Sequence, residues 1–193
     1  MINMELIIGI ISVILFFVLT HLGMLLYYKP FRYWQYYNCE LQKKRDDNKK
    51  SYWLYTFGYL FFAIGLLPFW INISKYIELY TSEIMICGVM ASTFFILQTI
   101  FRFENHPKMH GFSLTSSIIC LFITIRFLYE SLHLELIEIY YIVTILFFGI
   151  TFFTALAIKV DKFKRKTVDN VSQKLYILFL DIFFISLLSY LSF

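Results

Sequence analysis

Six long apolar stretches limit what this sequence can fold into. They cover residues 6–28, 52–71, 83–101, 114–132, 136–158 and 175–193. A helix needs about 20 apolar residues to cross roughly 30 Å of hydrocarbon, and irregular backbone cannot face lipid because its N–H and C=O groups would lack partners. We therefore expect an all-α fold: a single polytopic domain over residues 1–193, built as an integral membrane bundle of six transmembrane helices.

The composition excludes the other common classes of protein. The chain is 60% hydrophobic and 16% charged, whereas a soluble domain is about 45–50% apolar and 25% charged. Only seven Gly and three Cys exclude a collagen or a disulfide scaffold. The first apolar stretch follows Glu5 rather than a basic segment and ends without a small-residue cleavage site, so it is expected to be a retained anchor.

The positions of the basic residues predict the orientation of the bundle. Fifteen of the 17 Lys and Arg follow the first, third and fifth stretches, and only Lys75 lies on the opposite side. Short basic loops stay in the cytoplasm, so both termini should be non-cytoplasmic. An aromatic run at 31–37 predicts an interfacial helix after the first span, because Tyr and Trp favour the headgroup layer.

The richness in Phe, Ile, Tyr and Lys is typical of AT-rich coding sequence and favours a bacterial inner membrane or an organellar membrane.

Ionisable residues inside the apolar stretches are the first candidates for function, because each costs a few kcal/mol in hydrocarbon unless it is paired or hydrated. His21 in the first stretch can pair with Asp181 in the sixth if these helices touch. Arg126 and Glu130 share one face of the fourth helix, and Glu83 could join them. Two interpretations remain open: these groups clamp helices together, or they line a hydrated path for ions or protons.

Small residues in the third stretch predict where helices approach most closely. Cys87 with Ala91, and Gly88 with Ser92, form two pairs of small residues four positions apart. Packing drives helix association in lipid, and small side chains let two backbones come together. We expect the third helix to be central.

The loop after the third stretch holds a further candidate site formed by Glu104, His106 and His110. The ligands are too few for a confident metal site, and Pro107 interrupts the alignment of the two imidazoles, so no metal or cofactor is expected. Motifs for nucleotide binding or serine hydrolysis are absent. An interfacial enzyme that modifies lipids would have to use these histidines with nearby serines at positions 113, 116 and 117.

Taken together, these features favour a non-enzymatic membrane subunit that forms a pore or a scaffold within a membrane assembly. A component of a transporter for ions or small solutes is the second hypothesis, and an interfacial lipid-modifying enzyme is the third. The expected partners are the lipid bilayer and either copies of this chain or other membrane subunits. Nucleic acid is not expected, because Asp46 and Asp47 dilute the basic run at 43–50.

Overall fold

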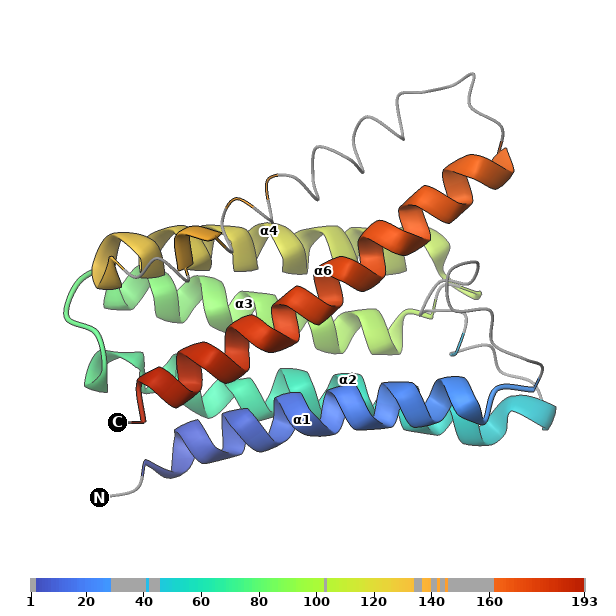
Figure 1. Ribbon diagram of the computed structural model, residues 1–193, viewed down its shortest axis with the longest axis horizontal. Coiled ribbons are helices and arrows are strands. Elements are labelled where there is room, and N and C mark those ends of the chain that lie inside the picture. Colours follow the sequence, from blue (N-terminus) through green and yellow to red (C-terminus); the bar gives the residue numbers. More distant parts are fainter. Residues whose placement is uncertain are drawn as a thin grey trace.

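The computed structural model describes residues 3–28, 41, 46–102, 104–133, 137–139, 142, 145 and 162–192, with the backbone alone at 46, 162–170, 172 and 173. Every regular element in these residues is a helix (Figure 1). The elements are α1 (Met4–Leu25), η2 (Asp46–Asn48), α2 (Lys49–Ile71), η3 (Ile73–Lys75), α3 (Thr81–Ile100), α4 (Pro107–Leu132) and α6 (Lys162–Tyr190). The all-helical expectation is therefore confirmed for the described part of the chain.

Four of these helices, α1 to α4, are long and apolar enough to cross a membrane. Their outer faces support the same conclusion, because large apolar residues recur there every three or four positions. On α1 this exposed stripe comprises Ile11, Ile14, Val18, Leu22 and Leu25. A helix on the surface of a soluble protein would carry polar residues in that stripe. The described helices thus have the character of a membrane-integral protein.

Two helices begin about two turns or more before the positions that the apolar stretches predicted. The helix expected at 114 begins at Pro107, which suits the first helical position because proline lacks an N–H that would have no helical partner there. Gly111 and Ser113 consequently lie inside α4. The helix expected at 175 begins at Lys162. The aromatic run at 31–37, and all of the stretch at 136–158 except helical residues at 137–139, 142 and 145, lie outside the described residues.

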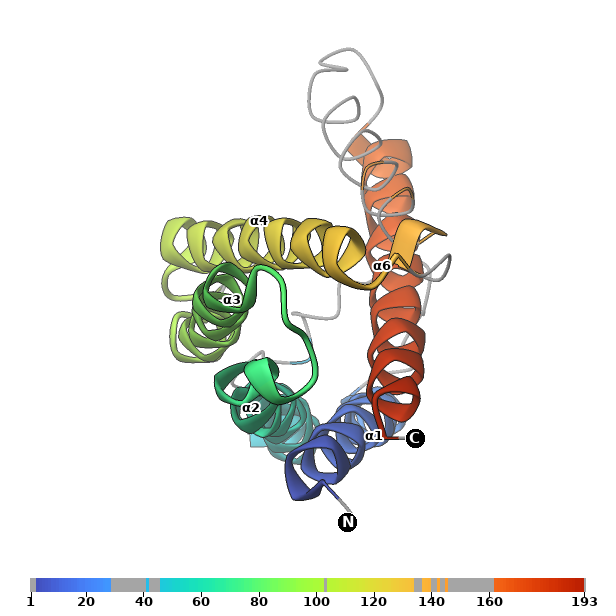
Figure 2. The same cartoon turned by 90° about the vertical axis from the view of Figure 1, so that its left-hand side faces the viewer.

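Consecutive helices from α1 to α4 pack against one another, and α6 packs mainly against α1. Both chain ends lie at one end of the bundle, which we call the terminal end (Figure 1). At the opposite end, the basic end, α1 and α3 finish, and α2, α4 and α6 begin. The helix α6 is inclined: its C-terminal part lies beside α1, and its N-terminal part diverges from it (Figures 1 and 2).

Two glycines allow the closest helix contacts. A Cβ atom on Gly65 of α2 would lie 2.2 Å from Cβ of Ser12 on α1, and one on Gly88 of α3 would lie 2.4 Å from the Trp70 ring on α2. Ala91 and Ser92 are also buried on α3, which contacts both α2 and α4. Several of the small residues of α3 therefore lie where neighbouring helices meet it.

Aromatic rings from four helices fill the bundle from mid-depth toward the terminal end. Phe62 of α2 lies at their centre, with ring centroids 5.1 Å from Phe16, 5.5 Å from Phe95 and 5.7 Å from Phe184. Trp70 extends the group, 5.9 Å from Phe184. Most of these contacts are edge-to-face, the arrangement that aromatic quadrupoles favour. We call these five residues the ring cluster.

Candidate functional site

A cavity of about 180 Å³ lies between α1 and α6. It forms because the two helices touch near the terminal end and then separate. Gly9 of α1 makes the contact possible, since a Cβ there would lie 2.9 Å from Cδ1 of Leu188. Toward the basic end, α6 inclines away (Figure 1). The cavity is lined by Phe16, Phe17, Thr20, His21 and Met24 of α1, and by Lys174, Ile177, Leu178 and Asp181 of α6.

Four polar side chains face this otherwise apolar cavity. Asp181 and Thr20 are each 3% exposed, and Lys174 is 2% exposed. Asp181 Oδ1 and Thr20 Oγ1 have no hydrogen-bond partner among the described residues, whereas Lys174 is not free. Because buried polar atoms are almost always hydrogen-bonded, these two oxygens are the atoms that a water molecule or a ligand in the cavity would contact.

His21 is the fourth polar residue of the lining. Its Nδ1 lies 2.8 Å from the Phe17 carbonyl oxygen, and its ring lies 4.1 Å from the Phe17 ring. A carbonyl oxygen can only accept, so Nδ1 carries the hydrogen. In the neutral imidazole, Nε2 is then a hydrogen-bond acceptor.

The structure brings His21 and Asp181 to the same cavity but not into direct contact by hydrogen bond or ion pair, since no such bond joins these two described residues. Counted from the contact of Gly9 with Leu188, Asp181 lies seven residues along α6 and His21 lies twelve residues along α1. The difference of five residues corresponds to about 7.5 Å of helix at 1.5 Å per residue, so His21 lies farther toward the basic end than Asp181. The space between their side chains belongs to the cavity.

Sequence reasoning did not select Lys174 or Thr20. Lys174 was counted among the basic connectors, and only the early start of α6 shows that it lies inside a helix and is buried. Nothing in the sequence marked Thr20 as a site residue, because threonine is common in membrane helices. Thr20 belongs to the site only because its side chain faces α6. The seven-residue spacing of Lys174 and Asp181, which puts both on one face of a helix, was the available clue.

Buried polar side chains also occur on other helices toward the basic end. Four further buried side-chain oxygens without a partner among the described residues lie within two turns of the basic end of their helices. The four are Ser51, Thr56, Gln98 and Ser113. Ordered water is the usual partner of such groups. In the opposite direction, Phe184 follows Asp181 by one turn, and the ring cluster ends the polar lining.

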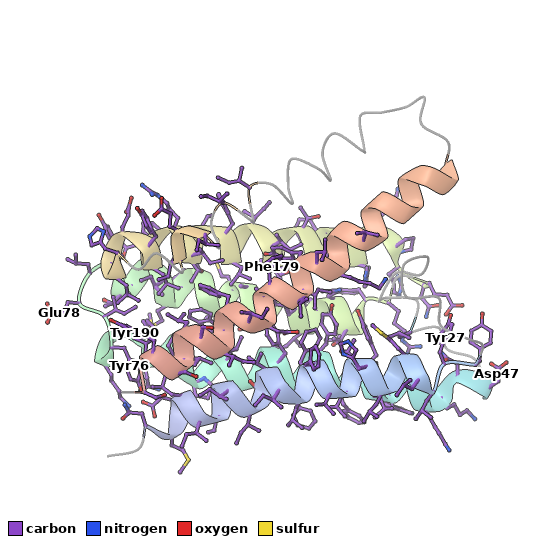
Figure 3. The ribbon with its side chains drawn as sticks, in the orientation of Figure 1. Tyr27, Asp47, Tyr76, Glu78, Phe179 and Tyr190 are labelled. Atoms are coloured by element: carbon purple, nitrogen blue, oxygen red, sulfur yellow. The ribbon has the colours of Figure 1, made fainter. Side chains whose placement is uncertain are left out.

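Charges near the terminal end are more exposed than Lys174 and Asp181, and two pairs of them form ion pairs. Arg126 and Glu130 form an ion pair along α4, with side chains 46% and 31% exposed. Glu83 is exposed and makes no ion pair with any described residue. Lys75 Nζ lies 2.8 Å from Glu5 Oε1 and ties the loop after α2 to the start of α1. Figure 3 shows Tyr76, Glu78 and Tyr190 at this end, opposite Tyr27 and Asp47.

The candidate loop site is divided between two environments. His110 is 2% exposed inside the bundle, with Nδ1 2.8 Å from the Phe101 carbonyl oxygen. Glu104 and His106 are exposed. Among the described residues, no three His, Cys, Asp or Glu gather as metal ligands. No hydrogen bond joins His110 to Ser113, so the interfacial enzyme hypothesis gains no activated hydroxyl at this position.

Comparison with known proteins does not assign this chain to a family. No family model, curated protein or solved structure matches it. The cavity between α1 and α6 and its four polar side chains are therefore the basis for a functional hypothesis.

Proposed function

We propose that this protein binds a small solute or ion in the cavity between α1 and α6 and carries it across a membrane. The observation that supports the proposal most directly is Asp181, a carboxylate 3% exposed with an oxygen that no described residue satisfies. A charged side chain in a membrane costs at least about 2.5–3.5 kcal/mol unless it is hydrated or paired. Binding a ligand offsets that cost and gives the buried carboxylate a role.

The proposed topology is six crossings with both termini on the non-cytoplasmic side. Two observations support it: both chain ends lie at the terminal end (Figure 1), and Lys and Arg flank the helices at the basic end. In this topology the buried polar groups near the basic end face the cytoplasm. A solute from that side would reach Asp181 through them.

The ring cluster favours a transporter over an open pore within one chain. Phe16 lines the cavity with Asp181, and Phe62 packs against both Phe16 and Phe184 in the interior. Passage beyond Asp181 would require these rings to move, so access from the two sides would alternate. A purely scaffolding subunit would use Lys174 and Asp181 only to clamp helices together, and that role does not account for the Asp181 oxygen that no described residue satisfies. Copies of this chain or other subunits could still cover the apolar outer faces.

Reconstituted vesicles on a solid-supported membrane test the transport proposal. Concentration jumps of ammonium chloride, potassium chloride, sodium chloride and sodium acetate would be applied, and the transient currents recorded. At least one salt should give a current that Asp181→Asn abolishes. The matched control is Glu78→Gln, which removes an exposed carboxylate at the terminal end (Figure 3). Currents that are absent for all four salts, or equal in both variants, would contradict the proposal and favour a scaffold.

A further inference from the structure

We infer that the cavity between α1 and α6 binds a small cation that donates hydrogen bonds, namely ammonium or a primary amine. This inference rests on the proposed function and names the class of ligand. It depends on the groups that the described residues leave unsatisfied, and these groups are acceptors.

Three acceptors face the cavity. Asp181 Oδ1 and Thr20 Oγ1 have no partner among the described residues, and both side chains are 3% exposed. His21 also lines the cavity, and its neutral imidazole would supply a third acceptor at Nε2, because Nδ1 is already engaged with the Phe17 carbonyl oxygen at 2.8 Å. A primary ammonium group has three N–H donors and one positive charge. The number of donors and the charge both match the acceptors and the carboxylate.

The net charge of the cavity would not select a cation by itself. Lys174 and Asp181 cancel, so a cation and an anion would each leave one uncompensated unit of charge. The hydrogen-bond inventory makes the choice, because the oxygens left without a partner among the described residues are those of Asp181 and Thr20, whereas Lys174 already has an interaction. An anion would have only the Thr20 hydroxyl as a donor in the groups left open, and it would face the Asp181 carboxylate.

The geometry favours a nitrogen cation over a metal ion. Calcium takes six to eight oxygen ligands, and the unsatisfied oxygens here are those of Asp181 and Thr20. Those two side chains lie on different helices, about one turn apart in the register set by Gly9 and Leu188. A tetrahedral ammonium group of a small amine can reach both, whereas compact metal coordination would require the helices to move. The cavity of about 180 Å³ has room for such an amine with water.

Apolar walls define the rest of the ligand. Phe16, Ile177 and Leu178 line the cavity beside the polar groups. A methyl or ethyl group on the nitrogen would contact these side chains while the ammonium group faces Asp181. Methylammonium should therefore bind at least as well as ammonium.

Binding to the purified full-length protein tests the inference, with methylammonium chloride as the probe in isothermal titration calorimetry. Tetramethylammonium is the matched ligand, because it keeps the charge and has no N–H donor. We expect binding of methylammonium, weaker by roughly tenfold or more for tetramethylammonium, as the loss of charge-assisted hydrogen bonds predicts. Asp181→Asn should weaken methylammonium to a similar degree, and Thr20→Val less. Glu78→Gln should leave the affinity unchanged.

Three outcomes would overturn the inference: no methylammonium binding to the folded protein, equal binding of tetramethylammonium, or preferential binding of acetate. Circular dichroism of each variant controls for loss of fold. The result is separable from the transport proposal. A current for potassium or acetate that depends on Asp181, without methylammonium binding, would contradict this inference but not the transport proposal. Methylammonium binding without any current would contradict the transport proposal but not this inference.

Discussion

The half of the bundle near the basic end has a polar interior, whereas the half near the terminal end is filled by aromatic rings. In the polar half, the side chains of Thr20, Thr56 and Ser51 are buried without partners among the described residues. In the ring half, buried hydroxyls such as Ser12 and Thr124 donate to carbonyl oxygens of their own helices, as Thr99 and Ser117 also do nearer the basic end. Asp181 lies where the two halves meet. Most of the buried side-chain oxygens without a hydrogen-bond partner among the described residues therefore lie in the polar half.

This difference suggests that the two halves have different roles. The rings hold four helices together through packing, which is the main source of helix association in lipid. The polar half contributes less packing and offers hydrogen-bonding groups to a ligand. Substitutions in the two halves should therefore separate stability from binding, and the following changes test that separation.

The largest loss of stability is expected from Phe62→Ala, because Phe62 contacts three other rings and is 2% exposed. Removing a buried Phe side chain typically costs about 3–5 kcal/mol. The free energy of unfolding in mixed micelles would measure it. The neighbouring Phe61 is 48% exposed on the outer face, so Phe61→Ala is the control and should cost far less. Equal losses would show that the ring cluster does not stabilise the ring half.

A smaller loss is expected from Gly88→Ala, which places a methyl group 2.4 Å from the Trp70 ring. Overpacking of this kind costs about 1–3 kcal/mol. Gly111→Ala in α4 is the matched control, because a Cβ there meets nothing within 4 Å. It should raise the free energy of unfolding by roughly 0.5–1 kcal/mol, since alanine favours a helix more than glycine. If both variants are stabilised, α2 and α3 do not approach as closely as described.

Two threonine substitutions compare the halves directly. Thr124 Oγ1 donates to the Cys120 carbonyl oxygen at 2.9 Å, so Thr124→Val should lower the free energy of unfolding by about 1 kcal/mol. Thr20→Val should change it by less than about 0.5 kcal/mol, because no fixed partner is lost. Methylammonium affinity should respond in the opposite way, with Thr20→Val weakening it and Thr124→Val leaving it unchanged. If the two variants changed the free energy of unfolding equally and also changed the methylammonium affinity equally, the distinction between the halves would be wrong.

The smallest effect concerns the loop at the terminal end. Burial and the neighbouring Glu5 carboxylate raise the pKa of Tyr76 from 10.0 to about 12. Between pH 10 and 12 the unfolded chain therefore loses this proton before the folded protein does, so stability should fall as the pH rises. Thermal unfolding at pH 9 to 11 would measure this dependence, and Tyr76→Phe should flatten it. An equally steep decline in the variant would assign the dependence to other groups.

Several features of the molecule followed from its sequence. The length and apolarity of the stretches predicted helices at α1 to α4, because only a helix satisfies its own backbone in lipid. The small residues around Gly88 marked a face of α3 that packs closely. The helix boundaries at Pro107 and Lys162 were missed, because hydropathy ends where charged or polar residues begin and a helix does not.

The sequence by itself determined that this chain forms apolar helices with basic residues concentrated in alternate connections, since hydrophobicity and charge are properties of each residue and its neighbours along the chain. Tertiary structure alone decided that Thr20, His21, Lys174 and Asp181 share one cavity. That outcome depends on the inclination of α6 against α1, which is set by the contact of Gly9 with Leu188. A crossing angle arises from how two surfaces interlock, and no pattern within either helix encodes it alone.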